Sequence, residues 1–395
     1  MRGSNQSGLR AYNERLILTL LRSHGPTPKA EVARITGLSA QSASVIMRGL
    51  EREGLIERCT PVRGKVGQPS IPMRISPDGA LFFGLKVGRR STDLLLVDFL
   101  GQISGRVRLT HPFPEPDRTL LFVRDAVQQL TSQLDTRQQT RIAGLGIAIP
   151  SYLWEWSKVI GVPAEKISVW RDRDIRAEID QLFDFPVYLQ NDASCACGAE
   201  LVFGGQDYPA DFLYFYVGYF IGGGLVLNNA LFVGPTGNAG ALGPLLVPNG
   251  EGQAQQLVNL ASLGGLEDKI VEEGGDANFL WEQTLTWDVD RTILEPWLQK
   301  AASSIAYAIV AACSVIDFKL VVLDGWLPKQ IREDLVALTA QELSELNMAG
   351  LIRPEMREGS VGPDARALGA ASLLLSQRFM VSQRMPRTET TPQVE

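Results

Sequence analysis

Residues 84–102, "GLKVGRRSTDLLLVDFLGQ", decide how the larger part of the chain is interpreted. The pattern predicts a strand, a tight glycine turn and a second strand that ends at Asp98, an arrangement suited to approaching a phosphate group. The turn region nevertheless carries Lys86, Arg89 and Arg90, where a nucleotide-using enzyme needs a carboxylate and small residues. The stretch therefore leaves two possibilities open, an enzyme or a regulator.

The composition is that of a globular protein with two or three domains, because 45% of the 395 residues are hydrophobic and 21% are charged. The most apolar run, residues 301–316, is too short for a membrane span and contains three serines. No secretion signal is recognised, and the four cysteines favour a reducing compartment, with the cytoplasm fitting best. We expect no membrane partner.

Charge divides the chain into a basic head and an acidic body. Residues 1–80 contain twelve Lys and Arg against six Asp and Glu, a net charge of +6. Because the whole chain carries −6, the remaining residues carry −12. A basic head favours contact with nucleic acid, and an acidic body discourages DNA contact elsewhere.

Three helices are predicted in the head. The first, in "AYNERLILTLLRSHG", has apolar residues at spacings of four and stops before Pro26. Thr27 is expected to cap a second helix with Pro28 at its first position, and Gly37 to end it. A third helix begins at Ser39, in "SAQSASVIMRGLEREG", so the head contains a helix-turn-helix.

The third helix is the predicted recognition helix. Helical spacing buries one face, formed by Ala43, Ile46, Met47 and Leu50. The other face carries small polar side chains and one arginine, which suit base edges and phosphates in a major groove. Its members are Gln41, Ser42, Ser44, Val45 and Arg48.

Two short strands joined by a glycine-rich turn follow, and the turn carries Arg63, Lys65 and Gln68. They form the wing of a winged helix-turn-helix domain, assigned to residues 1–80, whose basic tip is expected to contact phosphate or the minor groove. The alternative is a basic helical module that binds protein. Because one module covers little DNA, we expect a homodimer or homotetramer on an inverted repeat in double-stranded DNA.

From Leu81 onward strands alternate with helices, which predicts an α/β body of two lobes with a cleft between them. The body is assigned to residues 81–395. One lobe takes residues 81–190 with the C-terminal helix, and the other takes residues 191–365. Helices are expected, among others, over residues 193–203, 255–274, 291–316 and 329–346.

Four segments of the body occur in a recognisable order: "GLGIAIPS", "VYLQNDASCACGAELVFG", "GPTGNAGALGPLLV" and "DARALGAASLLL". Together they resemble the ROK family of repressors and sugar kinases. The head, including "GQPS" at residues 67–70, is similar to the family's repressor branch. The resemblance covers nearly the whole chain. It implies an N-terminal winged helix-turn-helix followed by a two-lobed, actin-like (ribonuclease H-like) sugar kinase fold.

Three segments depart from the family's kinases where these contact the nucleotide. Residues 86–90 replace Asp-x-Gly-Gly-Thr and supply no carboxylate for Mg²⁺. Tyr219 and Phe220 replace Thr and Gly, and residues 324–326, Asp-Gly-Trp, replace a Gly-Gly pair. We therefore expect no kinase activity and no catalytic residue. The opening hairpin is then retained for packing, with its charges in an internal salt bridge or a subunit contact.

The family's zinc site is also expected to be missing. Pro244 stands where the family has a histidine, and the following "PNGEGQAQQ" has no cysteine. Cys195 and Cys197 are two apart on a helix and point to different faces, which favours small core thiols. We expect neither a metal nor a cofactor.

The polar residues that remain in the cleft predict an effector site. Asn191 and Asp192, between a strand and a helix, can bond vicinal hydroxyls of a small polyol. The resemblance implies that Asp192 corresponds to the catalytic base that activates the sugar hydroxyl in the family's kinases. Without a phosphoryl donor, it would serve here only as an anchor for the ligand. The alternative for Asp192 is a helix cap. Ser151 and Asn238 are further candidates.

The identity of the effector stays open. Ala241 and Pro244 stand where the family has a sugar-contacting Glu and His, while Trp154 and Trp156 either stack on a ligand or pack. Our hypothesis is a DNA-binding transcriptional repressor of carbohydrate-related genes, whose sugar-like effector changes lobe closure and the fit of two heads to the operator. The alternatives are a ROK-type sugar kinase and a ligand-independent DNA-binding dimer.

Overall fold

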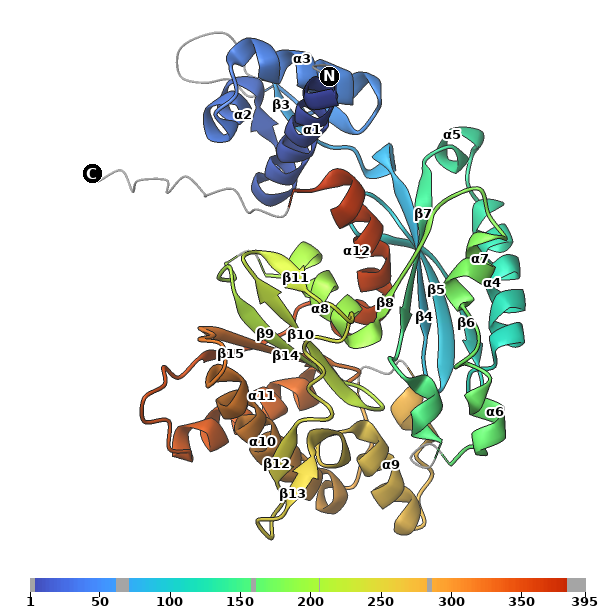
Figure 1. The fold of residues 1–395 in the computed structure, drawn as a ribbon, viewed down its shortest axis with the longest axis vertical. Helices are drawn as coiled ribbons and strands as arrows, with labels where there is room; N and C mark the ends of the chain where they lie inside the picture. Colours follow the sequence, from blue (N-terminus) through green and yellow to red (C-terminus); the bar gives the residue numbers. More distant parts are fainter. Residues whose placement is uncertain (1–3, 62–70, 158–160, 206, 283–285, 382–395) are drawn as a thin grey trace.

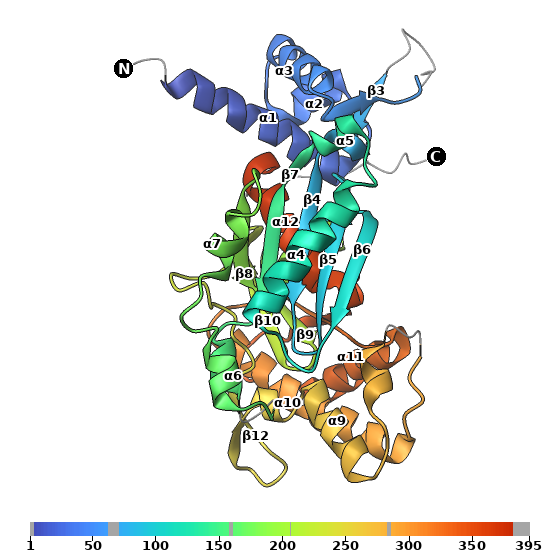
Figure 2. The same ribbon diagram turned by 90° about the vertical axis from the view of Figure 1, so that its right-hand side faces the viewer.

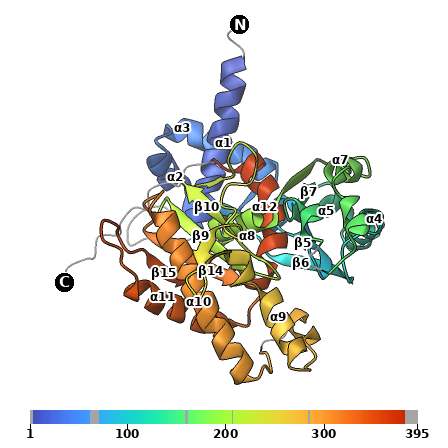
Figure 3. The same cartoon turned by 60° about the horizontal axis from the view of Figure 1, so that its bottom comes forward.

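The computed structural model describes residues 4–61, 71–157, 161–205, 207–282 and 286–381. A small head sits on one end of an elongated body, and the body consists of two lobes built on sheets (Figure 1). The first helix, α1 (Ser4–His24), extends beyond the rest of the head in two further views (Figures 2 and 3). The last helix, α12 (Ala365–Phe379), ends at the base of the head.

The head is the predicted winged helix-turn-helix. Helices α1, α2 (Lys29–Thr36) and α3 (Ala40–Arg52) pack with a sheet of order β1-β3-β2. The two wing strands are β2 (Ile56–Arg58) and β3 (Pro72–Ile75), which pair antiparallel. Buried Leu20, Val32 and Met47 belong to one apolar cluster, so the three helices share a core.

The expected cap at Thr27 is wrong. Thr27 and Pro28 form the short strand β1 (Thr27–Pro28), which pairs antiparallel with β3. The Thr27 hydroxyl donates to the Gly25 carbonyl at 2.9 Å, and α2 starts at Lys29 without a side-chain cap. Residues 27 and 28, which local propensity assigns to a helix start, therefore form the third strand of the wing sheet.

The first lobe is a five-stranded sheet of order β6-β5-β4-β7-β8. Its antiparallel part is β4 (Leu81–Val87), β5 (Ser91–Val97) and β6 (Ile103–Thr110), and its parallel part adds β7 (Ile142–Ile149) and β8 (Val187–Asn191). Strands β4 and β5 are buried along their whole length, because α12 covers one face and α4 (Pro116–Thr131) the other. The hairpin predicted from residues 84–102 is thus in the centre of this lobe.

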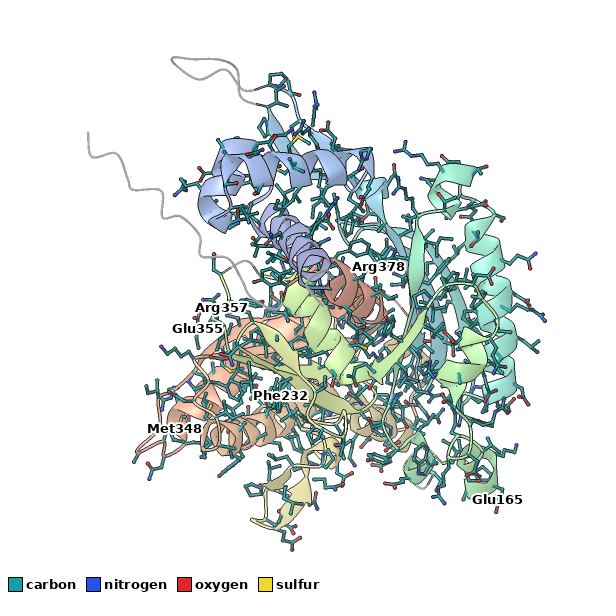
Figure 4. All side chains as sticks on the ribbon, turned by 45° about the horizontal axis from the view of Figure 1, so that its top comes forward. Glu165, Phe232, Met348, Glu355, Arg357 and Arg378 are labelled. Carbon is teal, nitrogen blue, oxygen red and sulfur yellow. The ribbon has the colours of Figure 1, made fainter. Side chains whose placement is uncertain are left out.

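The second lobe repeats the same topology in the order β11-β10-β9-β14-β15. Strands β9 (Phe212–Val217), β10 (Ile221–Leu227) and β11 (Ala230–Phe232) are antiparallel, while β14 (Leu320–Gly325) and β15 (Glu355–Glu358) run parallel to β9. Helices α10 (Arg291–Cys313) and α11 (Lys329–Glu345) pack together, and α11 contacts β14 and β15. Edge strand β15 carries Glu355 and Arg357 (Figure 4). Their side chains form an exposed ion pair at 2.6 Å, and charges on an edge strand discourage edge-to-edge association.

Two helices fill the space between the sheets. α8 (Asp192–Phe203) packs against β10 and α12, and α12 packs against β4 and β7 of the first lobe. Arg378 lies near the end of α12, below the head (Figure 4), and it donates to the Ala143 carbonyl at 3.5 Å. The chain's last helix therefore belongs physically to the first sheet, although the sequence between them forms the second lobe.

The helix expected over residues 255–274 is wrong in its first part. Ala254–Gln256 is strand β13, paired with β12 (Leu246–Pro248), and α9 (Leu263–Glu272) begins later. The Asn249 side chain accepts from the Glu251 and Gln253 backbone N–H groups, which closes a hairpin turn. The remaining short helices are α5 (Thr136–Gln139), α6 (Ala164–Ser168) and α7 (Ile175–Asp180).

Candidate functional site

The recognition helix α3 is built as predicted. Ser39 caps it, since its hydroxyl oxygen accepts from the Ser42 backbone N–H at 3.1 Å. The inner face is buried and consists of Ala43, Ile46, Met47 and Leu50. The outer face consists of the exposed Gln41, Ser42, Val45 and Arg48, with Ser44 half-buried.

Arg48 is the cation of that outer face, and its Nε donates to the Ser44 carbonyl at 3.3 Å. The side chain is exposed, so it can leave this contact for a phosphate or a base edge at little cost. The wing residues Arg63, Lys65 and Gln68 lie outside the described residues. The DNA-contacting role of the seven polar head residues stays a prediction; they are the three of the wing together with Gln41, Ser42, Ser44 and Arg48.

In the body, the residues at the expected nucleotide site bond to one another. The Lys86 ammonium, buried in β4, donates to Asp93 Oδ2 at 2.7 Å and to Ser91 Oγ at 2.9 Å. Arg108 Nε approaches the other oxygen of Asp93 at 2.8 Å. Burial lowers the pKa of Lys86 to about 8; burial opposes ionisation of Asp93 as well, but the two cations outweigh it and lower its pKa. The internal salt bridge is thus confirmed.

Aromatic rings occupy the approach to this hairpin. The Arg89 guanidinium lies over the Tyr219 ring at 5.4 Å, and the Tyr219 and Trp281 rings are 5.4 Å apart. Arg90 forms an ion pair with Glu267 of α9, which joins the first lobe to the second. The cavity left among these groups measures about 50 Å³. A cavity of this size holds only a few water molecules.

The third altered segment is structural too. Asp324 is fully buried at the end of β14 and accepts hydrogen bonds from the Tyr214 hydroxyl at 3.1 Å and the Gly362 N–H at 2.9 Å. Arg332 lies 3.2 Å from the same carboxylate. Burial raises the pKa of Asp324 to about 6. The indole N–H of Trp326 donates to the Leu280 carbonyl at 2.8 Å, so this segment ties the second lobe together.

Three of the four predicted effector residues come together at the start of α8. Asn191 caps the helix through the Ala193 and Ser194 N–H groups, at 3.0 and 3.1 Å, and its amide donates to Ser151 Oγ at 3.1 Å. Asp192 Oδ1 accepts from the Ala193 N–H at 3.0 Å. The cap at this position is thus Asn191, and Asp192 keeps its second oxygen for another partner.

That partner is Arg366 at the start of α12, whose Nη1 lies 3.3 Å from Asp192 Oδ2. The Arg366 guanidinium also lies 4.9 Å above the Tyr216 ring. Arg366 is not among the residues predicted for the effector site, although it stands within the quoted "DARALGAASLLL". Only the fold brings residues 192 and 366 together, so no local pattern could have found the pair.

The fourth predicted effector residue, Asn238, is half-buried in the loop after β11. Its neighbour Gly237 faces the Gln190 side chain, next to Asn191, at 3.8 Å from the position of a Cβ. Trp154 packs against the core of the first lobe and against the Tyr152 ring, at 5.7 Å between centroids. Of the two alternatives for Trp154, stacking on a ligand or packing, its contacts in the structure are those of packing.

The two helical cysteines are core residues. Cys195 and Cys197 are both buried, and burial raises their pKa values well above the ordinary thiol range. Across the described ranges, His, Cys, Asp and Glu side chains form no group of three that could hold a metal ion. Within those same ranges, none of the helices combines the length and apolar character needed to cross a bilayer.

Comparison with known families divides the chain as the fold does. Residues 10–57 match the winged helix-turn-helix DNA-binding family, and residues 82–377 match the ROK family. The chain belongs to the ROK family. Its head and its ROK body follow one another in the order expected for the repressor branch.

Individual ROK relatives are distant. The xylose repressor of Bacillus subtilis (strain 168) is 23% identical over 246 residues, 62% of this chain and 62% of the repressor. The chain thus matches less than two thirds of that relative's length. A solved ROK family transcriptional regulator, a homologue of the E. coli MLC protein, is 19% identical over 94% of this chain and 98% of its own, with a TM-score of 0.66. A ROK hexokinase from Thermus thermophilus is 24% identical over 74% and 98%, with a TM-score of 0.54. The two solved structures show the shared ROK fold.

Proposed function

We propose that this ROK protein is a DNA-binding transcriptional repressor of carbohydrate-related genes that acts as a homodimer or homotetramer on an inverted-repeat operator. The observation that carries the proposal is the combination of an exposed recognition helix with a nucleotide site filled by the protein's own side chains. A repressor needs the first and has no use for a triphosphate. The xylose repressor among its relatives supports a sugar, or a sugar derivative, as the effector class.

Pairing of two chains has a structural candidate in α1. The helix projects beyond the rest of the head (Figure 2), and its residues Leu9 and Tyr12 are 61% and 42% exposed. Two winged helices held at a fixed distance would match two half-sites about one turn of DNA apart. A ligand that changes that distance changes the affinity for the operator.

Helices α8 and α12 provide the route from the effector residues to the head. α8 begins beside Asn191 and ends at Phe203, whose ring lies 5.7 Å below the Arg22 guanidinium of α1. α12 starts next to Arg366 and leads to Val381, whose N–H donates to the Thr19 hydroxyl of α1 at 3.0 Å. At 1.5 Å per residue the two helices carry a displacement across about 18 and about 22 Å.

The Asp192→Asn substitution is expected to remove the effector response and to keep operator binding within about twofold of the wild type, because the change touches the Arg366 ion pair and no head residue. The measurement is a gel shift on the operator with and without the sugar that releases the wild type. Asp125→Asn, an exposed residue of α4, is the matched control. A full response in Asp192→Asn would show that the effector binds elsewhere.

We expect no ATP turnover in the presence of hexoses or pentoses. Lys86 replaces the carboxylate that holds Mg²⁺, and the remaining cavity of about 50 Å³ excludes a triphosphate. A coupled ADP-release assay, with a ROK hexokinase as the positive control, measures this. Sugar-stimulated release of ADP above the protein-free rate would favour the sugar kinase instead.

One observation favours a second candidate, a ligand-independent DNA-binding dimer. Asp192 already contacts Arg366, and Asn191 already contacts Ser151, so the carboxylate and the amide of the site have partners within the protein. Thermal unfolding in the presence of sugars and polyols separates the two candidates, since a ligand of the folded state raises the melting temperature. A shift with at least one sugar supports the regulated repressor, and a flat response supports the ligand-independent dimer.

A further inference from the structure

A small cavity between the lobes, beside the turn of the β4–β5 hairpin, is lined by an unusual number of cations. Its volume is about 50 Å³, and five positively charged side chains face it: Lys86, Arg89, Arg90, Arg108 and Arg366. We call it the cationic pocket. The five cationic side chains come from β4, the following turn, β6 and α12 of the first lobe. Trp281 and Trp326 of the second lobe line the other side of the pocket.

The carboxylates in contact with these cations do not balance them. Asp93 pairs with Lys86 and Arg108, and Glu267 pairs with Arg90. Asp192 contacts Arg366. With Arg89 left out of the count, the other four positive charges against three negative ones leave a net charge of +1 in a largely buried site. Uncompensated charge in such a site is costly, and an anion would offset it.

Hydrogen bonding shows the same imbalance. Within the described part of the chain, Arg90 Nε, Arg366 Nε and Trp281 Nε1 are buried and have no acceptor. All three groups are donors, and all three residues line the cationic pocket. Two carboxylate oxygens, Asp93 Oδ1 and Glu267 Oε2, also lack a hydrogen-bond donor, but each of these carboxylates already faces an arginine in an ion pair. The pocket therefore lacks an acceptor with several lone pairs.

We propose that the cationic pocket binds one small oxyanion of the phosphate class, without a metal ion, between Arg90, Arg366 and Trp281. The volume corresponds to roughly three to five water molecules at about 10–15 Å³ each, which admits a single tetrahedral oxyanion and excludes a nucleotide. Guanidinium groups bind phosphate oxygens through short, charge-assisted hydrogen bonds. The oxyanion is either free phosphate or the phosphoryl group of a small metabolite.

This site goes beyond the proposed function, since it requires neither DNA nor a neutral sugar. Arg90 belongs to the first lobe, Trp281 to the second, and Arg366 to the helix that leads to the head. An oxyanion that bonds all three holds the lobes closed. Arg366 also contacts Asp192, so an anion bound in the cationic pocket would change the ion pair at the candidate effector site.

The test is calorimetric titration of the full chain with inorganic phosphate, with sodium chloride of equal ionic strength as the reference and thermal unfolding in parallel. We expect saturable binding and a raised melting temperature in phosphate. Glucose and glucose 6-phosphate form the second pair of titrants. Tighter binding of glucose 6-phosphate than of phosphate assigns the pocket to a phosphorylated metabolite, and the reverse order assigns it to the free ion. Phosphate that acts no differently from chloride overturns the proposal.

Two variants locate the site. Arg90→Gln is expected to weaken phosphate binding by about tenfold or more, because it removes a charge-assisted donor. Trp281→Phe keeps the ring packing, removes one N–H and is expected to weaken binding about threefold. The matched control is Arg124→Gln on exposed α4, which should bind like the wild type. If Arg90→Gln does not fold, Trp281→Phe decides. Phosphate affinity in the folded variants equal to that of the wild type contradicts the assignment.

Discussion

Arg48→Glu is expected to abolish operator binding while the body remains folded. Arg48 is exposed on the outer face of α3, and its only described hydrogen bond is to the Ser44 carbonyl of the same helix. Loss of an arginine that contacts a base or a phosphate costs about 1–3 kcal/mol per half-site, and a dimer loses it twice. A glutamate adds repulsion from the phosphates. Together these effects predict a loss of at least about 100-fold in affinity.

The operator is first selected from genomic fragments with the wild-type protein, and affinities are then measured by gel shift at fixed salt, because phosphate contacts make binding salt-dependent. Arg124→Glu is the matched control: it makes the same charge change on α4, where the arginine is 56% exposed. Circular dichroism confirms that both variants fold. Affinity of Arg48→Glu within about threefold of the control would remove α3 from the DNA interface.

Gly369→Ala is expected to be among the most destabilising single substitutions in the body. Gly369 lies in α12, where a Cβ would overlap the Cys195 carbonyl of α8. Similar overlaps with the α12 backbone arise at Gly84 of β4 and Gly146 of β7. These are backbone atoms and cannot rotate away, so the helix must move. Overpacking of this kind costs about 3 kcal/mol, at the upper end of the usual range.

Thermal unfolding measures the effect. A loss of about 3 kcal/mol corresponds to a fall in melting temperature of roughly 5 °C for a body of about 300 residues, at about 2.1 cal/mol/K of unfolding entropy per residue. The matched control is Gly265→Ala in α9, where no atom other than those of its chain neighbours and its own helix backbone lies within 4 Å of the new methyl group, so the melting temperature should hold or rise slightly. Equal melting temperatures for Gly369→Ala and Gly265→Ala would show that α8 and α12 are not packed through glycine.

The sequence predicted those features that local patterns specify. Ser39 and the apolar spacing of Ala43, Ile46 and Leu50 defined α3, and the continuous apolar runs of β4 and β5 defined the central strands of the first lobe. Alternation of strands and helices, with the motif resemblance, gave the two-lobed fold. For the charges of the opening hairpin the sequence left an internal salt bridge or a subunit contact open, and Lys86 and Asp93 form the salt bridge.

Features that depend on distant contacts were missed or misplaced. Thr27 and Pro28 form a strand because β3, more than forty residues later, offers an edge to pair with. Residues 254–256 pair with β12 across a turn closed by Asn249, although their composition allows a helix. Arg366 meets Asp192 only because α12 returns between the lobes after the whole second lobe has been formed. Tertiary contacts overrode local propensity at each of these positions.

The most direct test of the proposed repressor is the anisotropy of a fluorescent operator titrated with the full chain, with and without a panel of sugars, at physiological salt. We predict binding at least about 1,000-fold tighter than to a scrambled duplex. With at least one sugar, the midpoint is predicted to shift by about tenfold or more. Binding to the selected operator no tighter than to the scrambled duplex would contradict the account.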